Sequence, residues 1–310
     1  MRIAVFGVGA VGGYFGGRLA EAGHDVVFVA RGRQLAALRE GGLRIESPAG
    51  DLQLPRVAVT GETESGAFEL VLLGVKAWQV AEVAPQVAAL LGADGVVLPL
   101  QNGVEAAEQL ARVVGSARVL GGVCRIVAQL AEPGLIRHAA VEPRIEIGEL
   151  DGPPGPRVAR VVRAFAGTTG VEAVAVADLK LALWEKFLFI APMGGVGAVT
   201  RRPVGVCRSV AETRELLEAA MREIAAIARA RGVGLDATAV RRTLGYVDGL
   251  PPGTTTSLQR DIAEGRPSEL EAQTGAVVRL GVECGVATPA NSFLYAALLP
   301  AEREARRRLA

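Results

Sequence analysis

Lys186 is the residue whose type and surroundings most directly suggest chemistry. It lies in the run LWEKFLFIAPMGG (residues 183–195), where almost every neighbour is apolar. Lysine and arginine together number 34, yet only three are lysines: Lys76, Lys180 and Lys186. A guanidinium keeps its proton in ordinary chemistry, whereas an ammonium can release one, and burial lowers the pKa of a lysine. Lys186 is therefore a candidate proton donor, and the alternative is a lysine retained by chance.

A glycine turn near the N-terminus suggests nucleotide binding. The apolar run RIAVFG is followed by Gly7, Gly9 and Gly12, then by a helical pattern and a second apolar run, DVVFVAR. In such a strand–turn–helix unit the three glycines permit a tight turn, a close approach to pyrophosphate and close helix packing, in that order. The alternative is a glycine-rich turn without a ligand. The residues predicted to bind the dinucleotide here are Gly7, Val8, Gly9, Ala10, Val11 and Gly12.

The end of the second apolar run indicates which dinucleotide is bound. An NAD site usually has Asp or Glu at this point, for the ribose hydroxyls. Here the chain reads VARGR, which places Arg31 and Arg33 there and no carboxylate. Arg31 is predicted to hold the 2′-phosphate of NADP(H), and the alternative for either arginine is a solvated side chain at a helix start.

Two further buried-strand patterns end in polar residues. The run FELVLLGVK ends at Lys76, and GVVLPLQNG ends at Gln101, Asn102 and Gly103. Ligands of open α/β sheets lie beyond the carboxyl ends of the strands. Lys76 and Asn102 are therefore expected near the ligand.

These residues must be positioned by two different kinds of domain. The pattern predicts an α/β Rossmann-type dinucleotide-binding domain over residues 1–179, followed by an all-α domain over residues 180–310 that binds substrate and dimerises. Further strands, mostly antiparallel, are expected at 44–47, 54–59, 119–130, 134–139 and 144–150. Helices are expected at 158–165, 209–232, 236–246, 257–263, 268–284 and 290–308.

Composition excludes several other classes of protein. The net charge is +1, so a nucleic-acid-binding face is not expected. The chain has only two histidines, His24 and His138, and its three cysteines lack CxxC spacing, which argues against a metal site and for a reducing, cytoplasmic compartment. We expect neither a signal peptide nor a membrane span.

Taken together, the motifs resemble the ketopantoate reductase (2-dehydropantoate 2-reductase) family, within the 6-phosphogluconate dehydrogenase-like superfamily. The segments that carry the resemblance span the chain in the family's order; they are GVGAVGGYFGGRLAEAGHDVVFVAR, VKAWQV, LQNGVE, LWEKF, SLQRDIAEGRPSELE and GVATPANSFLYAAL.

The resemblance implies roles at matching positions. Lys186 would donate the proton and touch the substrate, and Glu269 would orient the substrate hydroxyl and the donor. Ser257 would hold the substrate carboxylate, and Asn102 would lie between nicotinamide and substrate. Lys76 and Arg31 would contact the adenosine phosphate, and Asn102 and Glu269 are counted among the cofactor-binding residues as well.

Elementary chemistry is consistent with these roles. Reduction of a 2-oxo acid needs a hydride and a proton, and a desolvated lysine is a reasonable acid where no histidine serves. A carboxylate such as Glu269 would stabilise the ammonium in a dry site. Two alternatives stay open: Glu269 as a carboxylate at a helix start, and Ser257 as a helix N-cap.

The chain also departs from the family. The family's asparagines four and eight residues after the lysine, and a third further on, correspond here to Ile190, Gly194 and Val204. Each lost hydrogen bond to substrate weakens binding by about 0.5–1.5 kcal/mol. The expected activity is NADPH-dependent reduction of 2-dehydropantoate to pantoate in pantothenate biosynthesis. The alternatives are a reductase for another 2-oxo acid or an opine-like substrate, and a non-catalytic NADP sensor.

Overall fold

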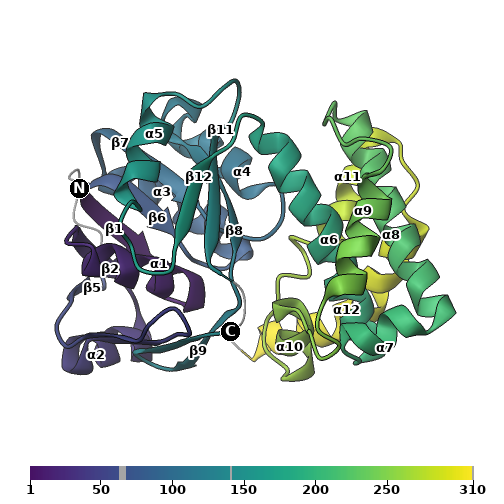
Figure 1. Cartoon of the computed structure of the whole chain (residues 1–310), viewed down its shortest axis with the longest axis horizontal. Coiled ribbons are helices and arrows are strands. Elements are labelled where there is room, and N and C mark those ends of the chain that lie inside the picture. The colour runs from purple at the N-terminus through teal and green to yellow at the C-terminus, as the bar shows by residue number, and fades with distance from the viewer. Residues whose placement is uncertain (63–67, 140–141, 309–310) are drawn as a thin grey trace. The chain divides into compact units, whose positions relative to one another are not determined.

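The chain folds into two compact units in this computed structural model, which describes residues 1–62, 68–139 and 142–308 (Figure 1). The first unit comprises Met1–Gln101 and Glu105–Leu179, and the second comprises Asn102–Val104 and Lys180–Ala310. An α/β unit is therefore followed by a helical one, which confirms the predicted fold class. The functions predicted for each domain stay predictions.

A five-stranded, fully parallel sheet forms the centre of the first unit. Its strand order is β5-β2-β1-β6-β7. These strands are β1 (Arg2–Phe6), β2 (Asp25–Val29), β5 (Ala58–Thr60), β6 (Phe68–Leu73) and β7 (Leu91–Pro99). The carboxyl ends of β1, β6 and β7 lie at one edge, because neighbouring strands run the same way.

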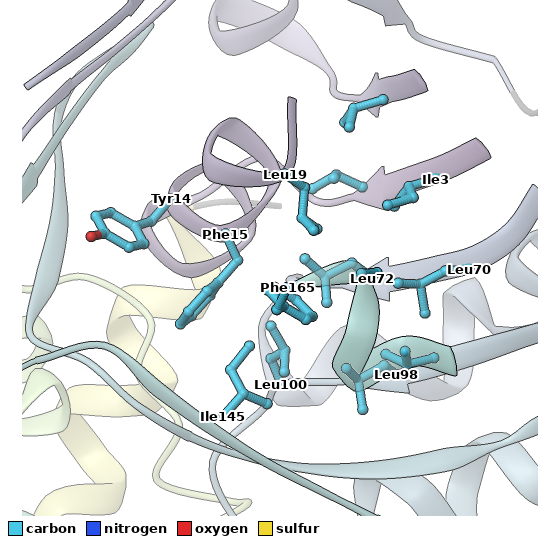
Figure 2. Packing of buried hydrophobic residues seen from close by; sticks show 14 of the residues in the cluster. Ile3, Tyr14, Phe15, Leu19, Leu70, Leu72, Leu98, Leu100, Ile145 and Phe165 are labelled. Carbon is cyan, nitrogen blue, oxygen red and sulfur yellow. The ribbon is translucent and has the colours of Figure 1, made fainter. Parts of the chain in front are cut away.

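Helices cover both faces of this sheet. One face packs against α1 (Ala10–Glu21) and α5 (Pro156–Ala164), and Figure 2 shows Phe15 and Leu19 of α1 among the strand side chains there. The other face packs against α3 (Val80–Leu90) and α4 (Ala106–Val114). Burial of both faces explains why the strands read as continuous apolar runs. The first unit also contains α2 (Gly32–Gly41) and the 3₁₀ turns η1 (Ala77–Gln79) and η2 (Ser116–Arg118).

Two smaller sheets complete the unit, and they correct several predicted strands. One has the order β4-β3-β10-β9 and the other β12-β11-β8. Their strands are β3 (Leu43–Glu46), β4 (Leu52–Leu54), β8 (Leu120–Arg125), β9 (Ala128–Glu132), β10 (Leu135–His138), β11 (Arg144–Glu149) and β12 (Glu172–Ala175). The single strands predicted at 54–59 and 119–130 are wrong, because each is two strands in different sheets. β10 also pairs in parallel with β3, and β11 with β12, so the antiparallel expectation holds only for β9–β10, β8–β11 and β3–β4.

The second unit is helical. Its helices are α6 (Leu179–Thr200), α7 (Val204–Ser209), α8 (Ala211–Ala230), α9 (Ala239–Gly249), α10 (Ser257–Ala263), α11 (Thr274–Cys284) and α12 (Pro289–Arg307). Side chains from α6, α8, α9, α11 and α12 form one apolar core.

Helix α6 contributes Trp184, Phe187, Leu188, Ala191, Met193 and Val196 to this core. By length and composition alone it could cross a membrane, since an 18-residue window has a mean hydropathy of 1.2. However, 61% of that window is buried inside the protein. A helix that is apolar on all sides and packed by others is typical of a domain core.

Candidate active site

The glycine turn joins β1 to α1, and its three glycines differ in what the protein requires of them. Gly7 has a φ of +91°, and a Cβ there would lie 2.7 Å from the backbone nitrogen of Val75. A Cβ on Gly12 would overlap the carbonyl oxygen of Gly7. A Cβ on Gly9, by contrast, would meet nothing closer than the Gly74 oxygen at 3.9 Å, and its φ is −85°. Folding therefore explains Gly7 and Gly12 but not Gly9, which fits a ligand that approaches the backbone at Gly9.

The start of α1 is also suited to an anion. Gly9 is the N-cap and offers no side-chain hydrogen bond, and the first turn carries no acidic residue. Ala10 and Val11 are the first helical residues and are partly exposed, whereas Val8 is buried in the core. The first N–H groups of a helix and its dipole attract phosphate. The residues present thus fit a dinucleotide pyrophosphate.

We expect Gly9→Ala and Gly12→Ala to fail in different ways. The methyl group of Gly9→Ala has room in the protein, but it stands where the pyrophosphate would approach the protein backbone. We expect a loss of NADPH affinity of about tenfold or more, or ~1.4 kcal/mol, with little change in Tm. The methyl group of Gly12→Ala strains the turn itself and should lower stability by about 1–3 kcal/mol. Fluorescence titration with NADPH and thermal melts of both variants test this; unchanged NADPH affinity in Gly9→Ala would contradict a phosphate site here.

The cations predicted for the adenosine end lie in the same unit. Arg31 is the N-cap of α2, two residues after β2 ends, and Arg31 and Arg33 are both exposed. Within the described part of the chain, neither guanidinium forms an ion pair with a carboxylate. Lys76 follows β6, and its ammonium lies 5.8 Å from the centre of the Trp78 ring.

Gln101 has a structural contact that the sequence pattern did not reveal. Its side-chain amide donates to the carbonyl oxygens of Leu73 and Val75, at 2.9 Å each. It therefore joins the end of β7 to the end of β6 and the residues after it. Asn102, the next residue, belongs to the second unit.

Asn102 and Glu269 are brought together in the helical unit although 167 residues separate them. The Asn102 amide donates to the Glu269 carboxylate over 3.0 Å, and the Glu269 side chain is buried. Gly103 fits tightly beside the same segment, since a Cβ there would lie 2.6 Å from the Ala272 oxygen. The structure thus pairs two of the residues that the resemblance assigned to the site.

Glu269 does not lie at a helix start. The helix predicted at 268–284 is wrong over residues 268–273, because α11 begins at Thr274. Glu269 lies in a hydrogen-bonded turn before it, in which its carbonyl accepts from the N–H groups of Ala272 and Gln273. The helix dipole therefore does not account for this carboxylate.

Ser257 is likewise not a helix cap. The N-cap of α10 is Thr256, whose hydroxyl accepts from the Gln259 N–H at 3.2 Å. Ser257 is the first helical residue and is partly exposed. Within the described residues its hydroxyl takes part in no hydrogen bond, which leaves it available to a ligand.

Arg260 is a cation near Ser257 that the sequence did not single out. It lies three residues later on α10, so both can share one face of the helix. Its guanidinium donates to the carbonyl and hydroxyl oxygens of Thr255. Burial lowers the pKa of Arg260 below its ordinary value, Asp261 opposes this shift and Arg266 adds to it. The side chain stays protonated near neutrality and favours an anionic ligand.

Lys186 lies in the first half of α6, between Trp184 and Phe187, which are buried, and its own side chain is partly buried. Lys180, six residues earlier on the same helix, is exposed. The environment of Lys186 thus differs from that of a surface lysine on the same helix.

The positions of the missing asparagines are filled in different ways. Val204 is buried in the helical core, and Ile190 is partly buried on α6. A Cβ on Gly194 would lie 3.1 Å from Leu258 and 3.2 Å from the amide oxygen of Gln273. Gln273 is fully buried, and among the described residues neither its amide oxygen nor its amide nitrogen has a partner. An amide is thus present beside Gly194, but it comes from the residue before α11.

This geometry defines a class of protein: a Rossmann-type dinucleotide-binding domain followed by a helical domain. Two models of the ketopantoate reductase family match the chain. The PanE/ApbA model matches residues 3–152, and its C-terminal counterpart matches residues 178–302. The chain belongs to the ketopantoate reductase family, and it is an oxidoreductase that uses a nicotinamide dinucleotide.

Individual relatives agree with this assignment. An uncharacterized oxidoreductase, YkpB, of Bacillus subtilis is 30% identical over 98% of this chain and 100% of its own length. The 2-dehydropantoate 2-reductase structure from Geobacter metallireducens is 32% identical with a TM-score of 0.90, covering 97% of this chain and 100% of that one. D-Mandelate dehydrogenase in a ternary structure with NADH and anilino(oxo)acetate has a TM-score of 0.88, covering 99% of each chain, but is only 22% identical and so shows the fold alone.

Proposed function

We propose that this protein reduces a 2-oxo acid to a 2-hydroxy acid with NADPH, and that 2-dehydropantoate is its first candidate substrate. The observation that carries the proposal is the buried Glu269 carboxylate held by Asn102 in the unit that also bears Lys186. A buried carboxylate is costly to maintain unless it is paired or used. Cofactor binding alone needs no proton donor such as Lys186 in the same unit.

The roles of the residues follow from their chemistry. The bound cofactor supplies the hydride to the carbonyl carbon of the substrate. The Lys186 ammonium polarises the carbonyl oxygen and donates the proton that the new alkoxide needs. Glu269 stabilises the Lys186 ammonium and orients the hydroxyl that forms on the substrate. Asn102 holds the Glu269 carboxylate by a hydrogen bond. The Ser257 hydroxyl and the charge of Arg260 favour the substrate carboxylate.

NADPH is the expected cofactor rather than NADH. Arg31 stands two residues after β2, where a carboxylate would otherwise bind the ribose hydroxyls, and its guanidinium is exposed and unpaired within the described residues. Lys76 adds a second cation after β6.

A different 2-oxo acid is the second candidate, and Ile190 and Gly194 favour it. These positions present an alkyl group and no side chain where the family is expected to present amides. An opine-like substrate would use the same acid–base residues. A sensor without catalysis does not account for the retained Lys186 and Glu269.

We also propose a compartment, an oligomeric state and a pathway for the protein. We place the protein in the cytoplasm as a homodimer that serves pantothenate biosynthesis. Within the described residues Cys124, Cys207 and Cys284 form no disulfide. Size-exclusion chromatography with light scattering gives the oligomeric state directly.

We expect ketopantoate to be used, but less efficiently than by a relative that carries the asparagines. Each missing hydrogen bond lowers substrate affinity by about 0.5–1.5 kcal/mol. NADPH oxidation with a panel of 2-oxo acids, under one set of conditions, measures kcat/KM for each. If ketopantoate is the best substrate with a KM of about 1 μM, at the tight end of the usual range, other groups such as Gln273 replace the amides and this expectation is wrong. If no 2-oxo acid is reduced, the proposed function itself is wrong.

A further inference from the structure

Ser268, the residue immediately before Glu269, is held by helix α12 through all of its polar groups. Its N–H and its hydroxyl both donate to one oxygen of Glu302, at 2.9 Å and 2.5 Å. Its carbonyl accepts from Arg306 at 3.3 Å, and its hydroxyl also accepts from the Leu270 N–H at 3.3 Å. The chain on the N-terminal side of Glu269 is therefore fixed by side chains 34 or more residues away.

The Glu302 carboxylate that holds Ser268 is itself buried. Glu302 is 1% exposed, and its second oxygen accepts from the Arg306 Nε at 2.6 Å, one turn further along α12. Removing a carboxylate from water costs several kcal/mol unless its oxygens are satisfied. Here both oxygens are engaged, so the charge of Glu302 serves to hold Ser268 and Arg306.

The position of Glu269 depends on such an anchor because its segment is not a regular helix. Residues 268–273 form a turn before α11, and in a turn no neighbouring helical residues fix the direction of a side chain. A reacting group must be held closely, since a displacement of about 1 Å can cost about 10²-fold in rate. The Asn102 hydrogen bond holds the far end of Glu269, and the Glu302–Ser268 contacts hold its backbone.

We propose that Glu302, acting through Ser268 and supported by Arg306, is a positioning residue that sets the catalytic geometry of Glu269. Glu302 does not touch the substrate in this proposal. The inference rests on the proposed function, because it takes Glu269 to act in the reduction.

A double-mutant cycle tests the coupling. The full-length protein is prepared as wild type, Glu302→Ala, Glu269→Gln and the double variant, and kcat is measured with NADPH and the best 2-oxo acid. We expect Glu302→Ala to lower kcat about 10- to 100-fold in the wild-type background. In the Glu269→Gln background we expect a further loss below about twofold, because residues that act through one group are not additive.

Two further variants separate positioning from stability. Glu302→Gln keeps an oxygen for the Ser268 N–H and hydroxyl, so it should recover most of kcat even though its pairing with Arg306 is lost. Glu223→Ala is the matched control, because Glu223 accepts in the same way from the N–H groups of Ala290 and Asn291 at the start of α12. It should lower Tm and leave kcat within about twofold, as expected for a stabilising contact remote from the chemistry.

The possible results distinguish an error in the positioning role of Glu302 from an error in the catalytic role of Glu269. If Glu302→Ala lowers kcat by the same factor in both backgrounds, Glu302 does not act through Glu269 and the positioning proposal is overturned. If Glu302→Ala lowers only Tm, as the control does, the contact is structural and the proposal is again overturned. If Glu269→Gln itself keeps wild-type kcat, the error lies instead in the role of Glu269 within the proposed function.

Discussion

Lys186→Arg should lose about 10²–10⁴ in kcat, the usual contribution of a general acid. Arginine keeps the positive charge but has a pKa above 12, so it gives up no proton near neutrality. The chain uses arginine for 31 of its 34 basic positions, since only three of them are lysines, so a plain cation at this place would not need to be a lysine. We expect Lys186→Ala to lose a similar factor, with NADPH affinity and folding retained in both variants.

The matched control is Lys180→Arg. Lys180 lies on the same helix, but it is exposed, whereas Lys186 is partly buried. We expect Lys180→Arg to keep wild-type kcat, which shows that an added guanidinium on α6 is harmless in itself. Because guanidinium is broader than ammonium, the alanine variant is needed to separate proton donation from a steric effect. Near-wild-type kcat in Lys186→Arg would mean that the amine serves another purpose.

Arg31→Ala should reduce NADPH affinity about 10- to 150-fold and leave NADH affinity nearly unchanged. A charge-assisted hydrogen bond to the 2′-phosphate contributes about 1.5–3 kcal/mol, which converts to this range of dissociation constants. NADH lacks that phosphate and so has nothing to lose at this position. Titration of both cofactors against both proteins measures the four dissociation constants.

Arg39→Ala is the control for this variant. Arg39 is an exposed arginine in the last turn of α2, at the opposite end of the helix from Arg31. It changes the net charge by the same amount, so a general electrostatic effect would appear in both variants. Equal affinity of the wild-type protein for NADPH and NADH would contradict the assignment of Arg31.

The nucleotide-binding fold was predictable because its signals are local. Gly7 has a positive φ and Gly12 packs on the Gly7 carbonyl oxygen, so both are set by the turn itself. The strands of the parallel sheet are apolar throughout because helices cover both faces. The smaller sheets were not predictable in the same way. Their pairing joins distant segments, such as β10 with β3. The sequence of a short strand does not indicate which other strand it pairs with.

The candidate site was predictable in its residue types but not in its local structure. The segment Pro267–Glu269 has the composition of a helix start, yet Glu302 holds Ser268 in a turn from 34 residues away. Gln101 and Asn102 are adjacent and follow the same predicted strand. Only the structure separates them, because Gln101 joins two strand ends while Asn102 binds Glu269 in the other unit.

The most direct test of the account is a single-turnover reaction of the wild-type NADPH complex. The complex is mixed with the best 2-oxo acid of the panel, and the loss of reduced-nicotinamide absorbance is followed alongside the amount of 2-hydroxy acid formed. We expect one 2-hydroxy acid for each NADPH consumed, and a much slower reaction of the same stoichiometry with the Lys186→Ala complex. NADPH that stays reduced with every 2-oxo acid, or a Lys186→Ala complex that reacts as fast as wild type, would contradict the account.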